Sequence, residues 1–75
     1  MDEGYILSNK FRRVIFDGLA SGESNIDRIA KKHRIIHNVA LRIADDFING
    51  GILEKKGNRY VLTNEGKKIA ENIRG

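Results

Sequence analysis

The chain of 75 residues contains no cysteine and no proline. Without cysteine it has no disulfide framework and no thiolate metal site. No linker rich in proline or serine divides the chain, and this length allows one domain with a small core. We therefore expect a single domain over residues 1–75, which depends on well-packed helices and on any partner chain for its stability.

Long apolar runs are also missing, because none approaches the roughly 18 residues that a membrane-spanning helix needs. No basic-then-apolar signal peptide opens the chain, so we expect the cytoplasm as its location and no membrane partner. The sequence has no nucleophile elbow, no phosphate-binding glycine motif and no paired carboxylates with room for a desolvated pocket. We therefore expect neither an enzyme nor a bound cofactor.

A metal site is not expected either. The two histidines, His33 and His37, stand four residues apart, but a predicted turn separates them. No carboxylate or thiol has the spacing that would complete a set of ligands with them. We expect His33 to occupy a position that is only half buried, and His37 to face solvent or a phosphate.

Basic residues outnumber acidic ones in this chain. Fourteen Lys and Arg residues stand against ten Asp and Glu residues, which gives a net charge of +4. Residues 52–75 hold six basic and three acidic residues, so this shorter part carries +3 of the total. Such an asymmetry favours a polyanionic partner.

Apolar periodicity predicts a first helix over residues 8–20, with Ser8 as its cap. Its apolar stripe consists of Phe11, Val14, Ile15 and Leu19. Phe16 lies about 100 degrees off the centre of this stripe. We expect Phe16 to seal the core against the last helix or the N-terminal segment, with contact to a second copy of the chain as the alternative.

Two further helices follow. One rises from a turn at residues 22–25, which ends in a cap, and stops near His33-Arg34. The next occupies residues 37–49 and stops at Gly50-Gly51. Its apolar arc consists of Val39, Ala40, Ile43, Ala44, Phe47 and Ile48, with Leu41 at the edge. Its polar face consists of Asn38, Arg42, Asp45, Asp46 and Asn49.

After Gly51 the period changes from 3.6 to about 2, which indicates strands. Residues 52–56 and 59–63 form the two strands of a hairpin around Gly57-Asn58. Thr63 or Asn64 then caps a last helix. The predicted fold class is mainly α with a small β-hairpin, in the order helix, helix, helix, strand, strand, helix, with room for a short extra strand beside the hairpin.

Two segments carry a family resemblance. Residues 26–30 (IDRIA) are followed by Ile35 and by a helix that closes in residues 51–53 (GIL), and residues 60–66 read YVLTNEG. Together they resemble the winged helix-turn-helix regulators of bacteria and archaea, in the broad MarR, ArsR and PadR-like sense. The resemblance implies a sequence-dependent DNA-binding protein, a small transcriptional regulator that binds double-stranded DNA as a homodimer. Residues 1–20 and 64–75 are the expected dimer surface, because members often pair there.

Small residues in these segments fit such a fold. Ala30 is small where two helices cross closely, and Ile35 fills the turn between them. Gly66 would cost about 1 kcal/mol relative to Ala in a free helix. Close approach to another backbone would explain it, and the alternative is that Gly66 only marks the start of a helix.

The chain also departs from the family pattern. Arg34 stands where many members have glycine, which predicts either a positive φ or a different turn. Ile36-His37 stands where Ser or Thr commonly opens the recognition helix, so Asn38 is an alternative cap. Residues 36–49 have a net charge of −1, since Arg42 stands against Asp45 and Asp46. This is unusual for a helix that enters the major groove.

The resemblance places helix 37–49 in the major groove and the wing, residues 52–63, on the backbone or in the minor groove. Asn38 would bond adenine, Arg42 guanine, and Leu41 a thymine methyl group. The wing would contact phosphates or the minor groove through its tip. The candidate DNA-binding residues are His37, Asn38, Leu41, Arg42, Lys55, Lys56, Asn58 and Arg59.

Several alternatives remain open at this point. Arg42 could pair with Asp45 or Asp46 on a solvated surface, and lysines on an edge strand also resist aggregation. Winged helices serve as protein-docking modules too, which the acidic third helix favours, and a non-specific architectural DNA binder is another possibility. The tip residues 55–59 carry the stronger electrostatic signal, so we expect the wing to supply affinity and Asn38 and Arg42 to supply sequence preference. The sequence does not identify a small-molecule effector.

Overall fold

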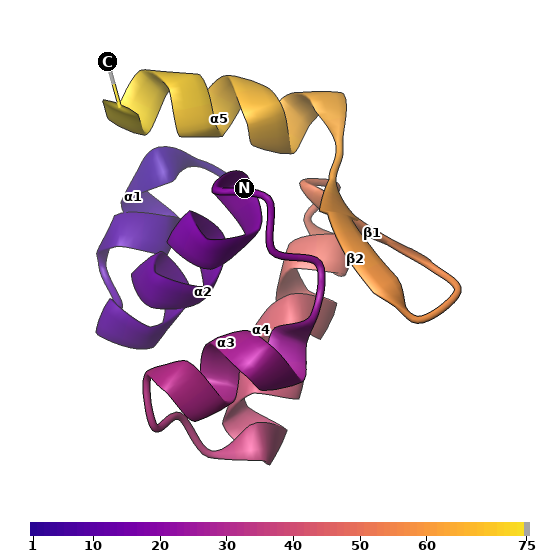
Figure 1. Ribbon diagram of the computed structural model, residues 1–75. Coiled ribbons are helices and arrows are strands. Elements are labelled where there is room, and N and C mark those ends of the chain that lie inside the picture. The colour runs from indigo at the N-terminus through magenta and orange to yellow at the C-terminus, as the bar shows by residue number, and fades with distance from the viewer. Residues whose placement is uncertain (75) are drawn as a thin grey trace.

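The computed structural model describes residues 1–74, which form helices and one antiparallel hairpin (Figure 1). The elements are α1 (Glu3–Leu7), α2 (Lys10–Ala20), α3 (Ile26–Lys32), α4 (His37–Asn49), β1 (Leu53–Lys56), β2 (Arg59–Leu62) and α5 (Asn64–Arg74). The expected fold class, mainly α with a small β-hairpin in a winged-helix-like order, is confirmed. The short helix α1 is additional to it.

The N-terminal boundary differs from the prediction. The Asn9 side-chain oxygen, not that of Ser8, accepts the free N–H groups of Phe11 and Arg12, at 2.9 and 3.1 Å. Ser8 instead ends α1. Since a capping residue has to stand outside the helix in an extended conformation, α2 begins at Lys10 rather than at Ser8.

The core gathers around Phe16 and Phe47, whose rings meet edge to face with their centroids 6.1 Å apart. Phe16 is only 1% exposed, whereas Phe11 is 43% exposed. The expectation that Phe16 seals the core is therefore correct, and the placement of Phe11 on the buried stripe is wrong. The reason is that α1, α4 and α5 all contact α2, so its buried arc is wider than a single stripe and lies around Phe16.

Helices α3 and α4 form the helix-turn-helix pair. Asn25 caps α3 by accepting the N–H of Arg28 at 3.2 Å. Ala30 and Ile35 are buried, and the Ile35 N–H donates to the Ala30 carbonyl at 2.9 Å. Between them Arg34 adopts a φ of +55°, the left-handed conformation that was one of the two alternatives for this turn. Asn38 lies inside α4 and does not cap it, because α4 already begins at His37 and no side chain bonds its first N–H groups.

The hairpin projects from the helices at the end of α4, and α5 crosses α1 and α2 on the other side (Figure 1). Lys56 pairs with Arg59 across the two-residue loop. Within residues 1–74 the sheet has two strands, and in place of a third strand the Tyr60 N–H donates to the Ser24 carbonyl at 2.9 Å.

Thr63 and Gly66 join the hairpin to α5. The Thr63 hydroxyl accepts the Gly66 N–H at 3.2 Å and donates to the Gly51 carbonyl at 2.7 Å. A side chain on Gly66 would overlap the backbone carbonyl of Ile52. The close approach expected for Gly66 is thus confirmed, and it holds the start of α5 against the start of β1.

Candidate nucleic-acid interface

The hairpin tip brings two positive charges face to face. Lys56 and Arg59 are directly opposite in the antiparallel register, and their side chains therefore share one face of the hairpin. Lys56 Nζ lies 3.6 Å from Glu54 Oε1, between side chains that are both exposed. Among the described residues no carboxylate forms an ion pair with Arg59. Like charges directly opposite each other destabilise a hairpin.

The other tip residues occupy the opposite face and the loop. Lys55 is opposite Tyr60, and its Nζ lies 5.5 Å from the centre of the Tyr60 ring. Asn58 is exposed in the loop. The bond from the Tyr60 N–H to Ser24 ties the hairpin to the segment before α3. The four predicted tip residues are thus together, exposed, and anchored to the helical body from one strand.

Helix α4 presents its outward face as a polar stripe. Asn38, Arg42, Asp45 and Asn49 repeat at helical spacing, and all four are exposed. Leu41 is half buried and packs against the core, so less of its side chain faces outward than a base contact would use. The structure therefore groups Asn38 with Arg42 and leaves Leu41 beside them on the edge of the core.

Arg42 does not form the ion pair with Asp45 or Asp46 that was the alternative to base contact. No carboxylate among the described residues is within ion-pair distance of it. Asp46 instead accepts the Tyr5 hydroxyl at 3.4 Å, which ties α1 to α4. The acidic side chains Asp45 and Asp46 belong to the C-terminal half of α4, and Asn38 and Arg42 belong to its N-terminal half. The negative charge of α4 therefore lies in its C-terminal half, and its N-terminal half carries the positive charge of Arg42.

His37 bridges the two helices of the helix-turn-helix pair. Its Nδ1 lies 2.7 Å from Asp27 Oδ1, and both side chains are more than half exposed. His37 is the first residue of α4, and Asp27 is in the first turn of α3. This contact leaves His37 at the surface, beside Asn38.

One part of this surface was not found from the sequence. Phe11 and Val39, both assigned to apolar stripes, are exposed and line a shallow cleft of about 300 Å³ between α2 and α4. The full lining is Asn9, Phe11, Arg12, Asn38, Val39, Arg42, Ile43 and Asp46. Ile36, just before α4, is 71% exposed. Periodicity could not have revealed this patch, because an exposed apolar residue has the same pattern as a buried one.

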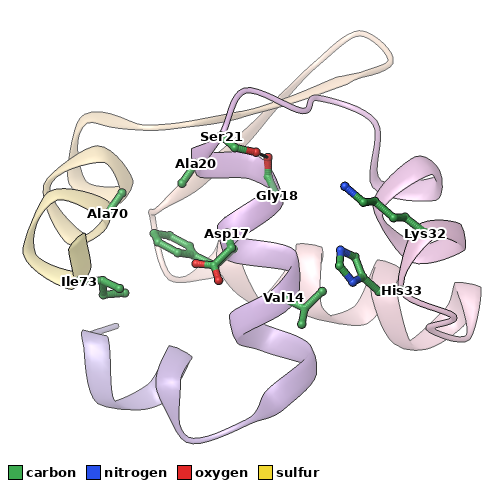
Figure 2. A pocket seen from close by; sticks show the side chains of 10 residues that line it. Val14, Asp17, Gly18, Ala20, Ser21, Lys32, His33, Ala70 and Ile73 are labelled. Carbon is green, nitrogen blue, oxygen red and sulfur yellow. Dashed lines mark hydrogen bonds between the residues drawn. The ribbon is translucent and has the colours of Figure 1, made fainter.

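A second cleft, of about 520 Å³, lies between α2, the end of α3, and α5 (Figure 2). Figure 2 shows Val14 and Asp17 of α2, Lys32 and His33 at the end of α3, and Ala70 and Ile73 of α5 around it. Val14, Ala70 and Ile73 are half buried, whereas His33 is exposed rather than half buried as expected. No residue of α4 or of the hairpin lines this cleft, so its occupation would leave both elements free.

Within residues 1–74, no group of three or more side chains is placed to hold a metal ion. No helix in this part of the chain is long and apolar enough to cross a membrane. No protein-family model matches the sequence, and no curated protein is significantly similar to it.

Proposed function

We propose that the protein is a DNA-binding transcriptional regulator of the winged helix-turn-helix type. The observation that carries this proposal is the opposed pair Lys56 and Arg59 at the tip of a projecting hairpin. Their repulsion costs stability in the free protein, and a phosphate between the two side chains would relieve it. Because phosphates repeat along a duplex, the wing then supplies affinity that depends little on base sequence.

In this proposal, the N-terminal half of α4 recognises the bases. Asn38 and Arg42 are exposed on one stripe, and amide and guanidinium groups form paired hydrogen bonds with adenine and guanine in the major groove. No side chain caps α4, so the N–H groups of its first turn are available to a phosphate oxygen. Asp45 lies three residues beyond Arg42, farther from the end of the helix that would enter the groove.

The proposal includes a homodimer that works in the cytoplasm. A single module buries only about 600–1,000 Å² on DNA, and two copies on a two-fold site provide more contact. The α2–α5 cleft of Figure 2 is the proposed pairing face, since its half-buried apolar side chains are remote from the DNA-facing elements. Sedimentation at several protein concentrations tests it. Ala70→Glu, on the edge of this cleft, is expected to weaken self-association, and a wild-type chain that stays monomeric at every concentration would contradict the proposal.

A protein-docking module is the second candidate. Two observations favour it, namely the exposed apolar side chains of Phe11, Ile36 and Val39 and the acidic C-terminal half of α4. Exposed apolar groups of this kind occur where proteins bind each other. A docking module would not bind duplex DNA at moderate salt, which makes the two candidates separable.

The deciding experiment measures binding to pools of random duplexes at two salt concentrations. A regulator enriches particular sequences, an architectural protein binds all duplexes with steep salt dependence, and a docking module binds none. Arg59→Ala is expected to weaken binding to all duplexes and to reduce the salt slope by about one. Arg42→Ala is expected to reduce the preference for selected sites about tenfold or more.

Lys68→Ala is the matched control for charge. Lys68 lies on α5 and pairs with Glu65 at 3.9 Å, away from both proposed contacts. Its loss should change affinity and sequence preference little. If Arg42→Ala left the preference intact while Arg59→Ala abolished it, the assignment of α4 as the reading helix would be wrong.

A further inference from the structure

The described part of the chain exposes few large apolar side chains, and most of them gather at one place. Met1 and Leu7 belong to the N-terminal segment, whereas Phe11 and Val39 line the cleft between α2 and α4, and Ile36 is outside the lining of this cleft. Ile36 immediately precedes the helix, and Val39 lies in its first turn. An exposed apolar cluster of this kind marks a contact surface rather than a chance exposure.

Polar side chains that recognise bases border this cluster. Phe11 and Val39 share their cleft with Asn38, Arg12 and Arg42. The Arg12 guanidinium already donates to the Tyr5 carbonyl at 3.1 Å and lies 3.9 Å from the centre of the Tyr5 ring. The one carboxylate in the cleft belongs to Asp46, which already accepts the Tyr5 hydroxyl. The polar groups that remain available beside Phe11 and Val39 are therefore the Asn38 amide and the positively charged Arg42, which complement a polyanion.

In the major groove, the C5-methyl group of thymine is the apolar feature that distinguishes one base pair from another. We infer that Ile36 and Val39, with Phe11 beside them, contact thymine methyl groups, while Asn38 bonds an adenine nearby. This inference rests on the proposed function and deepens it, because it names the class of site. The selected duplexes contain A·T pairs whose thymine methyl groups lie under the first turn of α4.

A duplex fits this cluster better than a protein surface does. A stable protein interface buries about 800 Å² on each partner around a core of well-packed anchors. Three exposed side chains interrupted by Asn38 and Arg42 do not form such a core. Thymine methyl groups, in contrast, are small apolar contacts separated by polar base edges, which suits apolar side chains interrupted by polar ones.

The test replaces thymine with deoxyuridine, which removes the methyl group and leaves the base-pairing edge unchanged. Duplexes selected from a random pool are synthesised in both forms, and the dissociation constant of the intact chain is measured for each. We expect about fourfold weaker binding for each contacted methyl group that is removed. Val39→Ser and Ile36→Ser, which remove the methyl groups of these side chains and leave a hydroxyl group, should reduce this difference between the two forms.

Leu7→Ser is the matched control, because Leu7 is 41% exposed but lies on α1, outside the cleft. This variant should keep the full difference between thymine and deoxyuridine. Thermal unfolding of each variant shows whether it is folded, and the ratio of the two dissociation constants is independent of the active fraction. Equal affinity of the wild-type chain for both duplex forms would overturn the inference and leave the proposed function intact. A protein-docking role predicts that the wild-type chain selects no duplex at all. That result would contradict both the proposed function and the inference.

Discussion

The Cα of Gly66 lies against the backbone carbonyl of Ile52, at a distance that leaves no room for a side chain. The carbonyl of Ile52 also accepts the N–H of Thr63 at 3.1 Å. The residue before β1 is thereby held against the residue after β2 and against the first turn of α5, through one backbone carbonyl at the base of the hairpin. The hairpin consequently leaves the helical body in a direction that these contacts define.

Replacing Gly66 with alanine tests this contact. In a free helix the change would stabilise by about 1 kcal/mol. Here the new methyl group would displace the Ile52 carbonyl, so we expect a loss of about 1–3 kcal/mol in the free energy of unfolding, measured in urea. Gly4→Ala is the control, because a methyl group at Gly4 would make only ordinary contact, 3.5 Å from the Asp2 carboxylate. Equal effects of the two substitutions would contradict the close approach.

The two phenylalanines of α2 are expected to differ sharply. Phe16→Ala removes a ring packed edge to face on Phe47 and should cost about 3–5 kcal/mol, enough to unfold a domain of this size at room temperature. Phe11→Ala removes a ring that is 43% exposed and should change stability far less, by about 0.5 kcal/mol. Circular dichroism during thermal unfolding measures both. A stable Phe16→Ala variant would show that the core is built differently.

Arg34→Gly should stabilise the protein. Arg34 has a φ of +55°, a conformation that costs a residue with a side chain about 1 kcal/mol or more. Glycine adopts it freely, and after the entropy that glycine loses on folding we expect a gain of about 0.5 kcal/mol. Gly51→Ala is the reverse test, since Gly51 has a φ of +80° and open space around its Cα. The melting temperature should rise for the first variant and fall for the second.

Arg59→Thr should raise stability and weaken DNA binding together. The substitution removes the repulsion with Lys56 and introduces a good strand former, for an expected gain of about 0.2–1 kcal/mol. Glu54→Gln is expected to lower stability slightly, because it removes the partner of Lys56. Chemical unfolding and duplex titration on the same samples decide the matter. A variant that loses stability and keeps its affinity would argue against the proposed role of the tip.

Much of the fold could be predicted from local patterns. The bounds of α4, the loop at Gly57-Asn58 and the cap at Asn25 follow from side chains that act on their own neighbourhood. The left-handed turn at Arg34 and the close contact of Gly66 were each one of two alternatives, because a residue out of place in its element indicates a constraint from outside it. Position in the sequence was sufficient in these cases.

The candidate site was less predictable. The sequence identified the tip residues and the pair Asn38 and Arg42, which the structure leaves exposed. It could not tell that Leu41 packs partly against the core or that Val39 does not. A helical wheel gives the direction of a side chain, but its burial depends on whether a neighbouring element covers that direction.

Composition and periodicity alone thus determined the class of fold, the order of its elements after α1 and the position of the basic hairpin, because these depend on spacing and local turn chemistry. Tertiary structure alone decided which of Phe11 and Phe16 is buried, which cap begins α2, and which apolar side chains remain exposed around α4. The physical reason is the same in each case. Burial and capping are decided by competition between neighbours in space, and α1, α4 and α5 meet α2 only after the chain has folded.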